Sequence, residues 1–309
     1  MRVTFNAQYR DLQVGIDRSS ETLLEMQRQV SSGKRISKPS DDPASASAAV
    51  TGRNDITRIE RYTQTADSVT SRLTVIDTVL SDITDKLSQA RSTGLAASGS
   101  QKTEVEREAA AQTLTGLRDA IFDDLNTSFN GIYVFAGTAS STKPYDRNPV
   151  GTPPAINPTY QGSSDEAEVD VDTGRSVKVT YNGESLAKGS AANDIFTVFD
   201  NLIAAVRGGS TVTTPSNQPG IEAAVADLKT AIDRISTSQT RLGTQMKTLE
   251  ELKPQLAEMK LQAQTRLDKT ENVDMAEAIS GMTQAETAYR AALGAAGTTT
   301  KTSLMDFIR

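Results

Sequence analysis

The chain has 309 residues and a formal net charge of −6, and it contains no cysteine, histidine or tryptophan. Without cysteine or histidine, no Cys/His nucleophile pair, no Ser-His-Asp triad and no Cys/His zinc site can form. The acidic balance argues against a nucleic-acid surface, which depends on clustered Lys and Arg. We therefore expect no enzyme activity, no cofactor, no metal and no nucleic-acid partner.

Aromatic residues make up only 5% of the chain and hydrophobic residues 37%. This composition favours long helices with thin cores over one thick core. The first residues contain no apolar run of signal-peptide length, and no stretch approaches the length of a transmembrane helix. We therefore expect no membrane insertion and, if the protein leaves the cell, no ordinary cleaved signal.

The N-terminal segment carries an apolar residue at alternating steps of three and four, with the polar Ser19 in the same stripe. Such a/d spacing is typical of a coiled-coil helix. The apolar members of this stripe are Phe5, Tyr9, Leu12, Ile16, Leu23, Met26 and Val30.

A matching stripe follows Asp274, which with Glu277 has the spacing of a capping box at a helix start. We predict that the two terminal helices pair with each other. The alternative is that both pack on a globular core. The C-terminal stripe consists of Met275, Ala278, Met282, Ala285, Tyr289, Ala292 and Ala296.

A short polar joint interrupts the helical pattern after the first stripe. A glycine there is predicted to end the N-terminal helix, and the residue before the first proline is disfavoured in a helix. Asp42 followed by Pro43 predicts an N-cap and the first residue of a new helix. We expect Asp41 to form salt bridges with a neighbouring subunit. The joint residues are Gly33, Arg35, Lys38, Asp41, Asp42 and Pro43.

The middle of the chain predicts long helices on either side of a β-rich insertion. Apolar heptads run from Ile59 to Ala90 and from Val225 to Leu249, and Pro254 is expected to kink or split the second helix. The segment EVDVDTGRSVKVTY predicts a β-hairpin. The fold class is mainly α: an elongated rod of long helices with paired N- and C-terminal coiled-coil helices and a small inserted β-rich domain.

Five domains follow from this pattern. The N-terminal assembly helix and joint span 1–42, and the first part of the rod spans 43–137. The inserted outer domain covers 138–192, the return part of the rod 193–272 and the C-terminal assembly helix 273–309. Two acidic groups are better explained by structure than by chemistry, since Asp41 and Asp42 fit a helix start and the DVDTG of the hairpin lacks the further ligands of a calcium loop.

Several segments resemble characteristic segments of the bacterial flagellin superfamily. In QVSSGKRISKPSDDPAS, Ser-Ser-Gly precedes a basic residue, an isoleucine and a paired Asp; this Asp-Asp-Pro version is similar to the superfamily members of the hook–filament junction. The remaining segments are FNGIYVFAGT, RLGTQMKTLE, DMAEAISGMTQAETAYRAAL and the closing SLMDFI. They cover both ends of the chain and the flanks of the insertion, but not the insertion itself.

The resemblance implies a structural adaptor of the bacterial flagellum. Such a protein is exported unfolded by the flagellar type III apparatus with the help of an export chaperone. It is then extracellular and forms a homo-oligomeric ring at the distal end of the hook. The implied neighbours are the hook-associated protein FlgK on one side and flagellin on the other. The terminal stripes would be weakly ordered in the monomer and ordered in the ring.

Two other functions compete with this interpretation. A filament flagellin would polymerise alone into long filaments. A secreted coiled-coil adhesin or effector would carry its main binding surface in residues 138–192. A neighbouring gene for the other junction protein would distinguish the adaptor from both of these alternatives.

Overall fold

The computed structural model describes residues 2–99, 102–147, 149–150, 155–156, 158–188, 194–209 and 220–307. The fold is mainly α, with long helices and a small strand-containing region, as the sequence predicts. The helices are α1 (Arg2–Ser32), α2 (Pro43–Ala97), α3 (Glu104–Leu125), α4 (Gly183–Ala187), α5 (Ile195–Gly208), α6 (Ile221–Glu271) and α7 (Met275–Phe307). Among the described residues, no helix is both long enough and apolar enough to cross a membrane.

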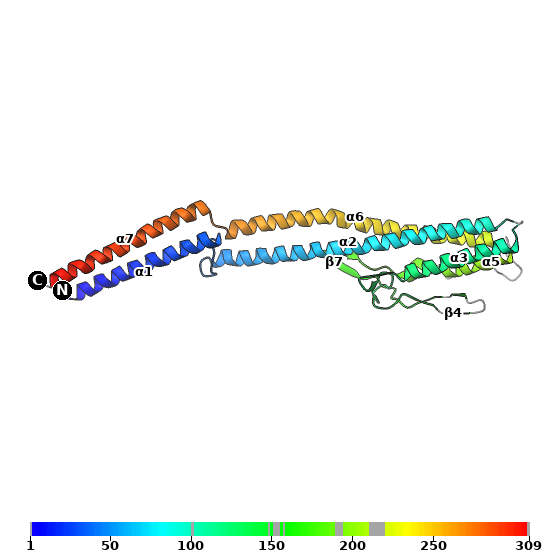
Figure 1. Cartoon of the computed structure of the whole chain (residues 1–309), viewed down its shortest axis with the longest axis horizontal. Coiled ribbons are helices and arrows are strands. Elements are labelled where there is room, and N and C mark those ends of the chain that lie inside the picture. The colour runs from blue at the N-terminus through cyan, green and yellow to red at the C-terminus, as the bar shows by residue number, and fades with distance from the viewer. Residues whose placement is uncertain are drawn as a thin grey trace. The chain divides into compact units, whose positions relative to one another are not determined.

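The chain divides into two compact units. The terminal unit comprises Met1–Glu60 and Glu258–Arg309, and the bundle unit comprises Arg61–Ala257. In the terminal unit, α1 and α7 lie side by side, with the first residues of α1 near the last residues of α7 (Figure 1). The predicted pairing of the two terminal helices is therefore present within one chain.

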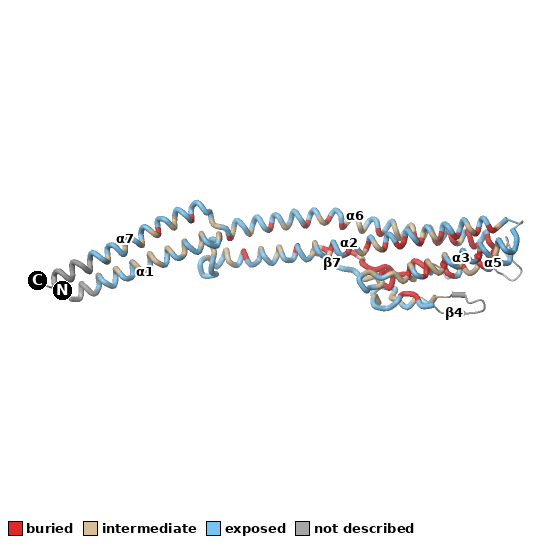
Figure 2. Tube along the Cα trace, in the orientation of Figure 1, coloured by how far each residue is buried: buried red, intermediate tan, exposed pale blue. Residues whose placement is uncertain are grey.

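In the bundle unit, α3 and α5 lie beside the α2 and α6 segments of that unit (Figure 1). Figure 2 shows that buried residues concentrate here. Gly94 of α2 marks a close approach, because a Cβ atom at this position would lie 3.1 Å from Leu202 Cδ1 and 3.1 Å from Val225 Cγ2. The fully buried residues of the bundle include Leu73, Ile76, Leu80, Ile83 and Leu87 of α2, Leu114 and Ile121 of α3, Phe199 and Leu202 of α5, and Leu228, Ile235 and Leu242 of α6.

The helix ends follow the capping residues of the sequence. Thr103 and Glu106 form a reciprocal capping box at α3, and the Asp194 side chain accepts the Phe196 N–H at the start of α5. The predicted break at Pro254 is wrong as a split, because α6 continues through this residue. A proline removes the hydrogen bond to the carbonyl four residues earlier. Pro254 and Glu250 are both exposed, so water can solvate that carbonyl.

The strand-containing region consists of short antiparallel pairs. The predicted hairpin is present as β7 (Glu168–Asp172) and β8 (Arg175–Lys178), with Val169 opposite Val177 and a register shift between Asp170 and Asp172. Pairing also joins β1 to β2, β3 to β6 and β4 to β5. These strands are β1 (Ser128–Phe129), β2 (Ile132–Tyr133), β3 (Tyr145–Asp146), β4 (Pro149–Val150), β5 (Ala155–Ile156) and β6 (Thr159–Tyr160).

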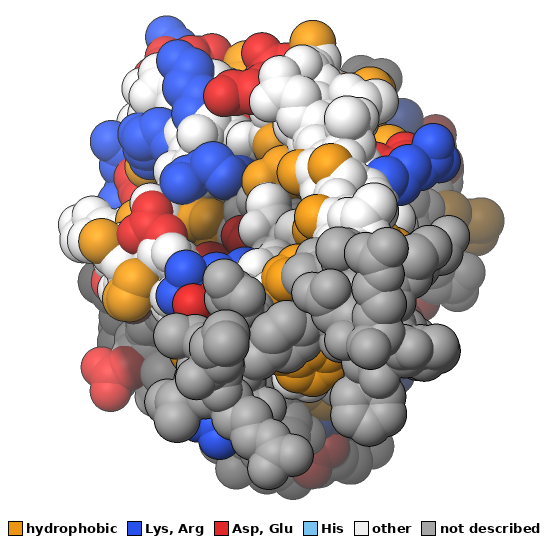
Figure 3. Space-filling view, turned by 90° about the vertical axis from the view of Figure 1, so that its left-hand side faces the viewer, with side chains coloured by type: hydrophobic (Ala, Val, Ile, Leu, Met, Phe, Trp, Pro, Cys, Tyr) orange, Lys and Arg blue, Asp and Glu red, His pale blue; other side chains and the backbone are white. Residues whose placement is uncertain are grey.

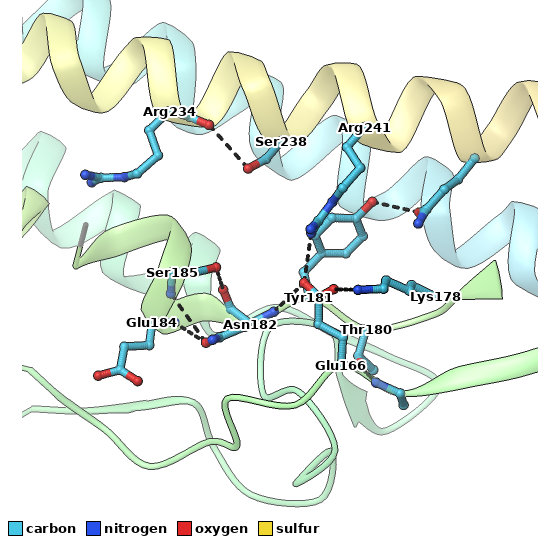
Figure 4. A network of polar contacts seen from close by, with 12 residues as sticks. Glu166, Lys178, Thr180, Tyr181, Asn182, Glu184, Ser185, Arg234, Ser238 and Arg241 are labelled. Carbon is cyan, nitrogen blue, oxygen red and sulfur yellow. Dashed lines mark hydrogen bonds and ion pairs between the residues drawn. The ribbon is translucent and has the colours of Figure 1, made fainter. Parts of the chain in front are cut away.

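Polar contacts attach this region to α6 (Figure 4). Arg241 donates to Glu166 at 2.8 Å, and its guanidinium lies 4.8 Å from the centre of the Tyr181 ring. Lys178 also contacts Glu166, at 2.7 Å. Burial raises the pKa of Glu166, but the hydrogen bond from Lys178 and the charge of Arg241 outweigh it, so the net effect lowers this pKa. The RLGTQMKTLE segment thus holds the strand-containing region through its first residue.

Arg234, which precedes Arg241 on α6, makes a second attachment. Its guanidinium donates to the carbonyls of Leu186 and Ala187, each at 2.8 Å. These carbonyls belong to the last turn of α4, whose C-terminal carbonyl groups lack partners inside the helix. Arg234 therefore caps α4 and fixes it against α6 in one arrangement.

Candidate assembly site

The predicted stripes of α1 and α7 face each other but bury little surface. Ala278 and Ala285 are buried, and a Cβ atom on Gly281 would lie 3.1 Å from the Met26 sulfur. The small residues of α7 therefore let the two backbones approach closely. The remaining described members are only partly buried; these are Leu12, Ile16, Leu23, Met26, Val30, Met282, Tyr289, Ala292 and Ala296.

Three predicted stripe residues stand apart from the rest. Tyr9 is 60% exposed and Met275 is 43% exposed, so neither side chain is covered within this chain. The side chain of Phe5 lies outside the described residues. The two exposed residues carry apolar surface that only a contact with another molecule would remove from water.

Sequence reasoning missed further exposed apolar residues on both helices. Val14 and Leu24 of α1 are 48% and 56% exposed, and Ile279 and Leu293 of α7 are 46% and 45% exposed. In α7, Ile279 and Leu293 each come directly after a stripe residue in the sequence, and this position beside the stripe could have indicated them. A two-helix pair covers one seam only, so it leaves these residues in contact with water.

The joint links α1 to α2 through main-chain bonds to the segment that precedes α7. Gly33 has φ +67°, and its N–H donates to Gln29 O at 2.9 Å, which confirms the predicted helix C-terminus. Val273 N–H donates to Gly33 O at 3.1 Å, and Arg35 N–H donates to Glu271 O at 2.7 Å. Lys34 and Asn272 form an antiparallel bridge. The two links between helices are therefore bonded to each other.

A buried carboxylate lies beneath this joint. The Glu271 side chain is 7% exposed and contacts Lys34 Nζ at 3.0 Å and the Arg53 guanidinium. Sequence reasoning missed both Glu271 and Arg53. The sequence did contain a signal for this contact. An acidic residue at the C-terminal end of a helix interacts unfavourably with the helix dipole, so cationic side chains are expected close to it.

The paired aspartates of the joint have separate roles within the chain. Asp42 Oδ1 accepts the Ser45 N–H at 3.0 Å, which confirms Asp42 as the N-cap of α2, and Arg35 lies 3.5 Å from its other oxygen. Hydrogen bonds from Ser45 lower the pKa of Asp42, and Arg35 adds to this effect. Asp41 Oδ2 accepts the main-chain N–H groups of Lys38 at 2.7 Å and Ser37 at 3.2 Å. The expected bridge from Asp41 to another subunit stays a prediction.

The start of α7 also follows the prediction closely. Asp274 Oδ1 accepts the N–H groups of Ala276 at 2.8 Å and Glu277 at 3.4 Å, and the helix begins at Met275.

Figure 3 views the molecule from the side where the chain ends lie, and the described cationic and anionic side chains are interspersed there with apolar ones. Among the described residues, no group of three or more Asp and Glu side chains could hold a metal ion.

Comparison with known proteins shows which class of protein the chain resembles. Residues 3–140 match the family described as the bacterial flagellin N-terminal helical region. This match takes in nearly all of α1, the joint, α2 and α3, and this part of the chain is therefore similar to the bacterial flagellin family.

Over nearly its full length the chain is similar to flagellar hook-associated protein 3, also called FlgL. It is 26% identical to the protein of that name from Escherichia coli, over 94% of each chain. The solved structure of flagellar hook-associated protein 3 from Legionella pneumophila matches with a TM-score of 0.62 at 15% identity, covering 71% of this chain and 98% of that one. FlgL from Xanthomonas campestris matches with a TM-score of 0.59 at 16% identity, covering 70% and 99%. The solved structures establish the likeness of fold.

Proposed function

We propose that this chain is a structural adaptor of the bacterial flagellum that forms the hook–filament junction. It would link the hook-associated protein FlgK to flagellin. The full-length similarity to hook-associated protein 3 supports a flagellar role. The composition agrees, because a chain without cysteine and histidine lacks the side chains of the common nucleophilic and zinc-dependent active sites.

The observation that carries this proposal is the incomplete burial of the α1–α7 pair. Its seam is lined by alanines and half-buried aliphatic residues, and Leu24 and Ile279 remain exposed outside the seam. Exposed apolar surface of this kind indicates an interaction site. In a homo-oligomeric ring, the pairs of neighbouring chains would cover one another. The assembly interface therefore includes both predicted stripes.

The joint has a defined part in this proposal. It would pass load from the paired assembly helices to the helices beyond, since the two links are bonded together by the Lys34–Asn272 bridge and by Glu271. The domain boundaries expected from the sequence, at 42/43, 137/138, 192/193 and 272/273, would separate the assembly helices, the two parts of the rod and the inserted outer domain. Export by the flagellar type III apparatus with a chaperone, and a final position at the distal end of the hook, complete the proposal.

A deletion strain tests the function directly. Loss of the gene should leave hooks without filaments and release flagellin into the medium, and the intact gene should restore filaments. Leu23→Asp or Met282→Asp should fail to restore them, because either change places a charge in the α1–α7 seam. Leu95→Asp is the matched control, since Leu95 is 49% exposed and lies in the bundle unit. A deletion strain with normal filaments would contradict the proposal.

A further inference from the structure

A groove in the bundle unit lies between α2 and the strand-containing region. Its volume is about 490 Å³. One wall is α2, from Arg61 to Arg72, and the other includes Phe129, Ile132 and Val169. Ile132 and Val169 are each 37% exposed, and Val69 and Val179 are buried in the floor. The groove therefore combines an aliphatic floor with open access.

The β1–β2 turn holds the outer wall in place. Asn130 has φ +51° and Gly131 has φ +78°, which is the backbone of a tight two-residue hairpin turn. This turn brings Phe129 opposite Ile132 in register. Both apolar side chains thus belong to a short, defined hairpin beside α2.

Both arginines of the groove lack a carboxylate among the described residues. Arg72 contacts only the carbonyl of Val179, at 3.5 Å, and Arg61 has no ion pair in the described part of the chain. The nearby Asp67 is paired with Lys253 at 2.9 Å. Burial lowers the pKa of Arg72, which reflects its partial loss of water. The groove lining contains no acidic residue.

The spacing of the two arginines sets the length of a matching ligand. They are eleven positions apart on one helix, which at 1.5 Å per residue corresponds to roughly 16 Å. An extended segment of about five residues covers this distance at ~3.3 Å per residue. We propose that the groove binds an extended peptide segment of another protein that carries a carboxylate near each end and aliphatic side chains between.

The chain's own strand of this character is already in use. β7 alternates acidic and aliphatic residues from Glu168 to Asp172, but its Val169 forms part of the groove wall. A second copy could not donate this strand without opening its own groove. The ligand is therefore assigned to a different protein. This proposal rests on the groove alone and does not depend on the flagellar role.

Peptide display on the full-length chain tests the proposal. Random peptides are selected against the unaltered protein, and the binding of enriched peptides is then measured on charge variants by fluorescence anisotropy. We expect enriched sequences with two acidic residues four to six positions apart and aliphatic residues between them. Arg61→Glu and Arg72→Glu should each weaken binding at least tenfold. Arg91→Glu changes the same charge on an exposed part of α2 outside the groove and should leave binding unchanged.

A second pair of variants tests the apolar outer wall. Ile132→Asp should weaken the same peptides at least tenfold, whereas Leu95→Asp, at another exposed aliphatic site, should not. Sedimentation equilibrium measures self-association in parallel. The absence of enriched acidic peptides, equal binding by all charge variants, or self-association abolished by Arg61→Glu would each overturn the proposal, the last because it would assign the groove to a second copy.

Discussion

The two units of the chain share the same heptad spacing of apolar residues but bury these residues to different extents. In the bundle unit, Leu73 and Leu80 of α2 are fully buried, and buried residues concentrate in this unit (Figure 2). In the terminal unit, Leu12 and Leu23 of α1 are only partly buried, because one helix covers them. Burial of apolar area is the dominant stabilising contribution, at roughly 25 cal/mol per Å². Identical spacing therefore yields a self-stable bundle in one unit and an incomplete pair in the other.

Hydrogen exchange should show the largest contrast between the two units. In the free monomer, we expect α1 and the part of α7 after Ala278 to exchange several orders of magnitude faster than the buried part of α2. The thin seam offsets little of the ordering entropy, which is about 1–2 kcal/mol per residue. Mass spectrometry of deuterium uptake measures this peptide by peptide. Equal protection in both units at monomeric concentration would contradict the comparison.

Matched leucine truncations should reproduce this contrast in stability. Leu80→Ala removes a fully buried side chain and should cost about 2–5 kcal/mol, lowering the urea midpoint of the main unfolding transition. Leu23→Ala removes a half-buried side chain of the terminal pair and should hardly change that transition. Circular dichroism during urea unfolding measures both. A large effect of Leu23→Ala on the main transition would show that the terminal pair folds together with the bundle.

The comparison also shows what the sequence could and could not predict. Heptad spacing, the capping residue Asp274 and the Asp42-Pro43 start were sufficient to place the long helices, since these signals are local. The sequence left a kink and a split at Pro254 both open, because solvation of the freed carbonyl depends on which side of the helix meets water. The flagellin resemblance was needed to propose a function.

The polar contacts of the sites depend on residues far apart in the chain. Glu271 meets Lys34 and Arg53 only after α6 has returned beside α2, and no spacing in the sequence specifies that meeting. The same holds for Arg241 and Glu166, which are 75 positions apart. Stripes that repeat along one helix are predictable from sequence, whereas ion pairs across helices require the packing itself.

Loss of the Glu271 charge should loosen the joint. In Glu271→Gln the cations Lys34 and Arg53 lose a buried partner, and since both are about half exposed, the cost should be about 1–2 kcal/mol. Trypsin should then cut after Lys34 and Arg35 roughly tenfold faster. Glu258→Gln is the control, because Glu258 is an exposed acid on the same helix whose amide replacement can still bond Gln262. Equal cleavage of both variants would show that Glu271 does not hold the joint.

The smallest and most local effect concerns the paired aspartates. Asp42→Ala removes the acceptor for the Ser45 N–H and should speed amide exchange in the first turn of α2 by roughly three- to tenfold, whereas Asp41→Ala should loosen only Ser37 and Lys38. The folded state lowers the pKa of Asp42, so its stabilisation is present above the unfolded pKa and is lost as the pH falls through the folded pKa. Exchange measured by NMR at neutral pH and near pH 3 separates the two roles. If Asp41 also bridges to a neighbouring subunit, Asp41→Ala should reduce swimming more at high salt than at low salt, because salt screens the weakened contacts that remain. Faster exchange at the start of α2 in Asp41→Ala but not in Asp42→Ala would show that Asp41, and not Asp42, caps α2.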